Sequence, residues 1–119
     1  MENSDSIFKI LNEYKIKMNG NARIRKILKD WSPLMHFIGS DNQSAFSMQI
    51  DRGEITSITQ DHSGTPDLII TALSSDLADM FSGKLNPTEK YLNGEISVRG
   101  TQTDIIKLDA ITMILWPED

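Results

Sequence analysis

The side chains best suited to acid–base or metal chemistry in this sequence are two histidines and a few carboxylates. The run Asp61-His62-Ser63 contains the three residue types of a hydrolase triad. Consecutive residues of an extended segment point to opposite sides, however, so these three cannot pass a proton along one line, and a loop edge is the better interpretation. His36 lies within a segment that alternates like a strand, which favours a hydrogen-bonded position over a ligand role. Asp76 and Asp79 fall in the first turns of an expected helix, where negative charge interacts favourably with the helix dipole.

Chemistry that depends on cysteine or on a metal is also disfavoured. The chain has no cysteine, which excludes a thiolate nucleophile, a disulfide framework and a cysteine-ligated metal. With only two histidines, a zinc site would need carboxylates from distant parts of the chain. We therefore expect no catalytic residue, no metal and no cofactor, and a protein that is not an enzyme.

Length and composition indicate a single soluble domain over residues 1–119, with residues 1–30 as an N-terminal helical segment. The chain is long enough for one sizeable hydrophobic core and too short for two. No apolar run approaches the roughly 20 residues that a membrane-spanning helix needs, and the opening residues are polar and acidic rather than signal-like. Together with the lack of cysteine, this predicts a cytoplasmic protein.

The charge of the chain is unevenly distributed. Residues 1–30 hold seven Lys or Arg against four acidic residues, a balance of +3, so the remaining residues carry −8 of the total net charge of −5. An overall acidic chain is a poor partner for nucleic acid. The basic residues of the N-terminal helices are either a solvated surface or a face that docks transiently on anionic membranes. The residues expected to dock are Lys17, Arg23, Arg25, Lys26 and Lys29.

The first half of the chain changes from a helical to an alternating pattern. Apolar residues recur at helical spacing over 7–18, and a second helix is predicted over 24–31, where Ile27 and Trp31 share an apolar stripe before Pro33. Four segments then read as strands: 33–39, 44–51, 54–62 and 67–73. Arg52-Gly53 predicts a hairpin between the second and third of them, whereas Ile55 and Ile58 have opposite parity, which requires either a bulge or partial cover on both faces.

The dense turn and cap residues of the second half serve several short elements. A helix capped by Ser74 or Ser75 is predicted first, and the spacing of Asn86, Pro87 and Glu89 then predicts a second helix through a capping box. A strand over 95–100 and a final helix over 103–116 complete the pattern. These short elements are expected to cover another part of the fold rather than to form a reaction centre.

The final predicted helix is apolar around most of its circumference. A helix that lies on a sheet needs an apolar stripe on one side only, so this helix is expected to be buried on two sides. The second side could be another helix, a dimer partner or a bound apolar ligand. Its apolar residues are Ile105, Ile106, Leu108, Ala110, Ile111, Met113, Ile114, Leu115 and Trp116.

A set of motifs over residues 65–117 has a fairly specific spacing. They are Asp67-Leu68-Ile69-Ile70-Thr71, the segment Leu77 to Phe81, Gly83-Lys84-Leu85, Pro87, Tyr91, Gly94, the strand Ile96-Ser97-Val98 ending at Gly100, and Lys107-Leu108. In these residues, and in the order of its elements, the sequence resembles the sterol carrier protein 2 family of lipid-binding domains. The resemblance implies an α+β fold, a mostly antiparallel five-stranded sheet covered by helices, with a hydrophobic tunnel between sheet and helices.

The same resemblance implies the function of a non-enzymatic carrier. The ligand would be a fatty acid, a fatty acyl-CoA, a phospholipid or a sterol-like lipid, and its partners would be that ligand and, transiently, an anionic membrane. The alternative is a ligand-free interaction or dimerisation module, a homodimer or an accessory to an enzyme. The residues expected to line the tunnel are Phe46, Met48, Ile50, Ile70, Met80, Phe81, Leu85, Tyr91, Val98, Leu108, Ile111 and Leu115.

Overall fold

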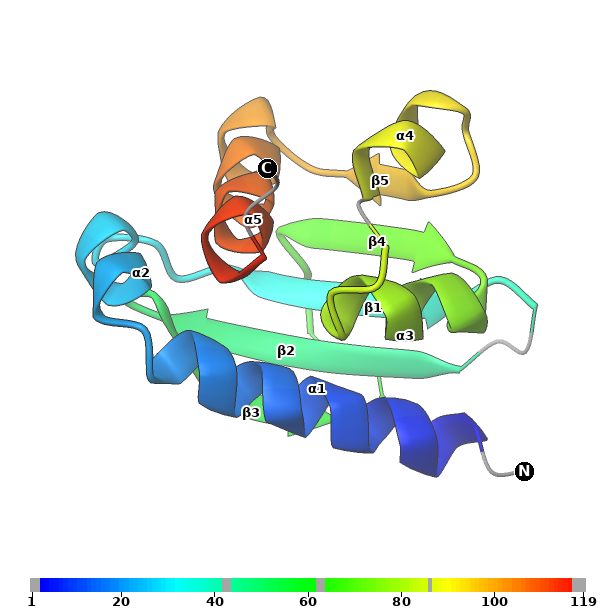
Figure 1. Ribbon diagram of the computed structural model, residues 1–119, viewed down its shortest axis with the longest axis horizontal. Coiled ribbons are helices and arrows are strands. Elements are labelled where there is room, and N and C mark those ends of the chain that lie inside the picture. Colours follow the sequence, from blue (N-terminus) through cyan, green and yellow to red (C-terminus); the bar gives the residue numbers. More distant parts are fainter. Residues whose placement is uncertain (1–2, 42–43, 62–63, 86, 117–119) are drawn as a thin grey trace.

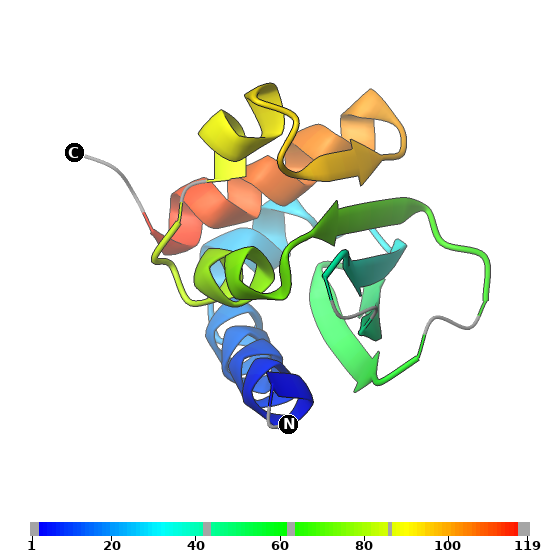
Figure 2. The ribbon, with the colours of Figure 1, turned by 90° about the vertical axis from the view of Figure 1, so that its right-hand side faces the viewer.

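The computed structural model describes residues 3–41, 44–61, 64–85 and 87–116, and it places a layer of helices against one face of a sheet (Figures 1 and 2). The helices are α1 (Asn3–Asn19), α2 (Ala22–Ile27), α3 (Ser74–Phe81), α4 (Pro87–Leu92) and α5 (Gln102–Leu115). The strands are β1 (Leu34–Gly39), β2 (Ala45–Asp51), β3 (Glu54–Thr59), β4 (Leu68–Ala72) and β5 (Ser97–Arg99).

The sheet has five strands in the order β3-β2-β1-β4-β5. Three neighbouring pairs are antiparallel and the central pair, β1 with β4, is parallel, so the sheet is mixed and mostly antiparallel. The predicted α+β fold class and strand number are therefore confirmed. Alternation along β1 and β2 sends Phe37 and Phe46 to the helix-covered face, where they are 1% exposed.

The predicted β2–β3 hairpin forms, and the parity conflict in β3 is resolved by a bulge. Arg52 and Gly53 both have positive φ, 52° and 80°, as a two-residue hairpin turn of the twist-compatible type requires. The register shifts between Gln49 and Ile50, and this shift brings Ile55 and Ile58 to the same face of the sheet.

The second helix is shorter than its sequence pattern predicts. It ends at Ile27, which is 51% exposed, and Leu28 is its C-cap, so the predicted helix over 24–31 is too long and Ile27 does not belong to the buried stripe, whereas Leu28 is buried as predicted. Trp31 lies beyond the helix, buried, and its indole Nε1 donates to Oδ1 of Asp104 at 2.7 Å. This long-range hydrogen bond joins the turn after α2 to the first turn of α5.

The caps of α3 and α4 differ in how well the sequence predicts them. Neither Ser74 nor Ser75 caps α3 as expected; instead the carboxylate of Asp41 accepts from the backbone N–H of Ser74 at 2.9 Å and from its hydroxyl at 3.0 Å. A residue 33 positions away thus supplies the cap, which no local pattern indicates. Helix α4 begins at Pro87 as predicted, while the expected cap Asn86 lies outside the described residues.

Helix α5 is packed against the described chain on one side only, so of the three expected covers for its second side, another helix is not the one found. Ile111 is fully buried, but Ile106 and Met113 are 59% and 64% exposed. Within the described chain, the helices and strands cover one side of α5 and leave the opposite side open to solvent. None of the helices in the described ranges is both long and apolar enough to cross a bilayer.

Candidate functional site

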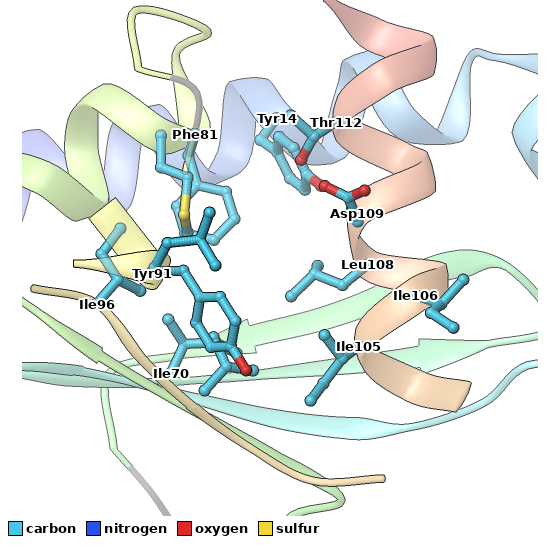
Figure 3. Close-up of a pocket in the computed structure, with 13 residues that line it drawn as sticks. Tyr14, Ile70, Phe81, Tyr91, Ile96, Ile105, Ile106, Leu108, Asp109 and Thr112 are labelled. Carbon is cyan, nitrogen blue, oxygen red and sulfur yellow. The ribbon is translucent and has the colours of Figure 1, made fainter. Parts of the chain in front are cut away.

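A largely apolar pocket of about 280 Å³ lies between the β4–β5 end of the sheet and the helices above it (Figure 3). We call it the α4–α5 pocket. Its walls come from every helix except α2, with β4 and β5 as the sheet contribution. The lining residues are Tyr14, Ile70, Met80, Phe81, Tyr91, Leu92, Ile96, Val98, Ile105, Ile106, Leu108, Asp109 and Thr112.

The pocket has a buried floor and an exposed rim. The floor includes Ile70, Phe81 and Ile96, which are at most 4% exposed. The rim includes Leu92 of α4 and Ile106 of α5, which are 76% and 59% exposed. An apolar group that entered between α4 and α5 would therefore meet apolar side chains from rim to floor.

Six of the predicted tunnel residues line this pocket. They are Ile70, Met80, Phe81, Tyr91, Val98 and Leu108. They come from β4, α3, α4, β5 and α5, elements that the sequence pattern placed in the right order. Contact of these residues with a lipid remains a prediction.

Three predicted tunnel residues on β2 lie elsewhere. Phe46, Met48 and Ile50 are buried on the helix-covered face of β2 but do not line the pocket. Helix α1 closes this part of the sheet, and Phe8 stacks on Phe46 with a distance of 6.2 Å between ring centroids. The space over β2 is therefore filled by the protein's own side chains.

Three predicted residues near or within α5 also lie outside the lining. Ile111 is 0% exposed and belongs to the packed core, while Leu85 and Leu115 are half-buried against that core. Helical spacing explains the division on α5: Leu108 and Thr112 face the pocket, whereas Ile111 is turned toward the interior. The apolar residues of α5 surround most of its circumference, so they alone do not indicate from sequence which side of the helix borders the pocket.

The sequence did not single out the polar members of the lining. Asp109 and Thr112 interrupt an apolar helix one turn apart, and this is the signal that could have found them. Tyr14 is part of the apolar stripe of α1 and reads from sequence as ordinary core.

Tyr14 is the most buried polar group of the pocket. Its side chain is 4% exposed, and its ring packs edge-on against Phe81 with centroids 4.9 Å apart. It also stacks on Trp116 at 6.0 Å, which ties α1 to the end of α5. Burial raises the pKa of the Tyr14 phenol above its usual range, so the hydroxyl is protonated at neutral pH.

Helix α4, which carries part of the rim, is fixed by a lysine. The ammonium of Lys90 donates to Oε1 of Glu95 at 3.2 Å. This hydrogen bond, followed by the charge of Asp76, raises the pKa of Lys90. The positive charge thus holds α4 against the segment that follows it.

The residues that resembled reactive groups have structural surroundings. His36 is buried within β1, opposite Ser47 of β2, and the backbone carbonyl of Asp61 accepts from the Ser47 hydroxyl at 2.7 Å. His62 and Ser63 lie outside the described residues. No cluster of three or more acidic, histidine or cysteine side chains suited to a metal occurs in the part of the chain that the structure describes.

The basic residues proposed for membrane docking surround α2. Arg23, Lys26 and Lys29 are exposed, and Ile27 stands among them with half of its surface open. Arg25 is engaged within the protein, since its guanidinium donates to the carbonyl of Asn19 and lies 3.9 Å from the Glu54 carboxylate.

Comparison with known proteins points to one family. The sequence profile described as "SCP-2 sterol transfer family" matches residues 16–113. No match to this sequence is found among curated proteins. Among solved structures, the sterol carrier protein domain 2 of Helicoverpa armigera is similar, with a TM-score of 0.69, 19% identity, and coverage of 96% of this chain and 91% of that one.

Two further solved structures are similar in fold. Palmitated SCP2L2 from Aedes aegypti has a TM-score of 0.55 at 14% identity, with 84% of this chain and 92% of that one covered. A stereoselective inverting sec-alkylsulfatase from Pseudomonas sp. has a TM-score of 0.59 at 12% identity, and the match covers 80% of this chain but 14% of the sulfatase. The fold therefore occurs both as a separate protein and as a small part of a large enzyme.

Proposed function

The chain belongs to the SCP-2 sterol transfer family, and from that premise we propose that it is a non-enzymatic carrier that binds the apolar part of a lipid in the α4–α5 pocket. The observation that carries this proposal is the continuous apolar wall from the exposed rim to the buried floor. The ligand class is a fatty acid, a fatty acyl-CoA, a phospholipid or a sterol-like lipid. The palmitate of the Aedes aegypti relative supports this choice.

The size of the pocket suits part of a lipid better than a whole phospholipid. Its volume of about 280 Å³ lies just below the ~300–1,000 Å³ that ligand pockets span. Each methylene removed from water contributes about 0.8 kcal/mol, so about ten buried methylenes give ~8 kcal/mol before the costs of association. Those costs are of the order of 4–15 kcal/mol, so micromolar binding needs polar contacts as well.

Native mass spectrometry of the purified protein tests the carrier function. The protein should carry co-purified lipid, or should accept palmitic acid or hexadecanol after delipidation, with one ligand per chain. A protein that accepts no lipid under any reloading condition would refute the carrier function.

A second function is favoured by the open side of α5. Ile106 and Met113 are exposed on this helix, and an apolar surface of this kind suits a partner protein or a second copy. In this alternative the chain is a ligand-free interaction or dimerisation module accessory to an enzyme, as its similarity to a small part of the sulfatase suggests. The same mass spectra would show a lipid-free dimer.

We further propose that the exposed cations around α2 dock the carrier on anionic membranes. Lys17, Arg23, Lys26 and Lys29 are exposed, and Ile27 offers an apolar side chain for insertion between headgroups. The acidic remainder of the chain would be repelled by the same surface. The domain would therefore approach a bilayer with α2 first.

A further inference from the structure

The hydroxyl of Tyr14 is an unused hydrogen-bonding group at the α4–α5 pocket. Tyr14 lines the pocket and is only 4% exposed. Among the residues that the structure describes, it has no hydrogen-bond partner; its contacts there are the rings of Phe81 and Trp116. Among the described residues, the only side-chain oxygen that is buried without a hydrogen-bond partner belongs to Asp76, so the Tyr14 hydroxyl reaches the open space of the pocket and is free to bond a group that enters there.

Two further oxygen-bearing side chains lie beside Tyr14. Asp109 and Thr112 are three residues apart on α5 and so share a face of the helix. Thr112 is also one turn from Trp116, on which Tyr14 stacks, so the Tyr14 ring lies against the same side of α5. Figure 3 shows these three side chains together at one end of the pocket, while the hydroxyl of Tyr91 lies at the other.

The end of the pocket formed by Tyr14, Asp109 and Thr112 carries a negative charge, and no lining residue carries a positive charge that would balance it. Asp109 is the only ionisable carboxyl group among the lining residues, and none of them is Lys, Arg or His. Asp109 is exposed, so water reaches this side of the cluster and screens part of its field. The remaining polar groups here, the hydroxyls of Tyr14 and Thr112, are neutral.

We propose that Tyr14, Asp109 and Thr112 form the site for the polar end of the ligand, and that this site selects an uncharged lipid alcohol over a fatty-acid anion. This inference rests on the proposed carrier function. The alcohol O–H donates to the Asp109 carboxylate, and its oxygen accepts from the Tyr14 or Thr112 hydroxyl, so the alcohol is satisfied both as a donor and as an acceptor. A fatty-acid carboxylate has no proton to donate, and it places a second negative charge beside Asp109.

The decisive experiment compares hexadecanol with palmitate, which have the same chain length. Both are titrated into the delipidated full-length protein at neutral pH, with displacement of an uncharged fluorescent lipid as the readout. Because the alcohol gains a hydrogen bond to the Asp109 carboxylate that palmitate cannot make, hexadecanol should bind at least tenfold more tightly than palmitate.

Two variants test separately the contribution of the Asp109 charge and that of the Tyr14 hydroxyl to lipid binding. Asp109→Asn should strengthen palmitate binding severalfold and bring the ratio of the two affinities close to one. Glu13→Gln is the matched control, because it removes the same charge from an exposed position of α1 outside the lining, and it should leave the ratio unchanged. Tyr14→Phe should weaken hexadecanol binding about three- to tenfold without lowering thermal stability, since the hydroxyl has no partner in the protein to lose.

The outcomes distinguish this inference from the carrier function. If neither lipid binds to the wild-type protein and the fluorescent lipid does not bind either, the proposed function fails and the selectivity fails with it. If palmitate binds as tightly as hexadecanol, or if Asp109→Asn leaves the ratio unchanged, the carrier function stands and the assignment of the polar site is overturned.

Discussion

The ammonium of Lys90 lies 3.7 Å from Oδ2 of Asp76, a carboxylate oxygen that is buried and has no hydrogen-bond partner among the described residues. Asp76 is 8% exposed in α3, whereas Lys90 belongs to α4. The ion pair therefore joins the helix at the rim of the pocket to the helix at its floor. Because this oxygen is out of reach of bulk water, its negative charge is compensated by the Lys90 cation.

We predict that Lys90→Met loosens α4. The change removes the cation from a buried carboxylate, so α4 should detach more often, and its backbone amides should exchange with deuterium faster than those of the sheet. Lys84→Met is the control, since Lys84 is an exposed lysine without an ion pair among the described residues. Adding Asp76→Asn to Lys90→Met should restore part of the protection, and equal exchange in all three variants would argue against the ion pair as a tether.

The sequence predicts the order of the elements well and the walls of the site only in part. Alternation and turn residues identify the strands because one sheet face is buried, and Arg52-Gly53 identifies the hairpin because few residues adopt positive φ. Two features escape sequence pattern because they depend on residues far apart in the chain. Asp41 caps α3 across 33 positions, and Phe8 stacks on Phe46, which fills the space predicted to be tunnel.

Gly83 tests how the end of α5 is packed. Gly83 has φ +82°, and a Cβ there would lie 2.3 Å from Nε1 of Trp116. Gly94 has nearly the same φ, +81°, with no atom within 4 Å of its added Cβ, so it is a matched control. In urea unfolding, Gly94→Ala should cost about 1–2 kcal/mol through its backbone alone. Gly83→Ala should cost a further ~1–3 kcal/mol, because Trp116 must move. Equal losses would show that the contact with Trp116 is unimportant.

Tryptophan substitutions at two positions one turn apart on α5 distinguish a residue of the pocket wall from a residue of the packed core. Leu108→Trp fills the α4–α5 pocket, so hexadecanol affinity should fall at least tenfold while the free energy of unfolding changes by less than about 1 kcal/mol. Ile111→Trp overpacks a position that is 0% exposed and should cost about 1–3 kcal/mol in stability. Calorimetry and lipid displacement on both variants check the pair. A large stability loss in Leu108→Trp with unchanged affinity would contradict the pocket as the binding site.

Alkaline pH should destabilise the protein through Tyr14. Burial raises the pKa of the folded Tyr14 phenol above its unfolded value of about 10. The neutral form is thus favoured in the folded state, and the associated stability is complete below pH ~10 and is lost as the pH rises above it. Urea unfolding between pH 9 and 11 should therefore show a steeper loss for wild type than for Tyr14→Phe, as linkage predicts. Parallel curves would mean that Tyr14 ionises as easily in the folded state as in the unfolded state.

The last prediction concerns the exposed cations around α2. The triple variant Arg23→Glu, Lys26→Glu and Lys29→Glu should lose co-sedimentation with vesicles that contain phosphatidylserine, since each cation near the surface contributes up to about 1 kcal/mol. Salt should weaken wild-type binding in the same way, because the Debye length falls to about 10 Å at 0.1 M. Arg25→Gln should have a smaller effect than Arg23→Gln, because the Arg25 guanidinium is already engaged by Asn19 and Glu54.

A second triple variant is the control for the change in net charge. Lys9→Glu, Lys84→Glu and Arg99→Glu change the net charge by the same amount at exposed positions on α1, on the turn after α3 and on β5. If repulsion by overall charge governed vesicle binding, the two triple variants would behave alike. Docking through α2 requires that only the first one loses binding, and that Ile27→Ser weakens binding to the same vesicles even at raised salt, because the Ile27 contribution is apolar.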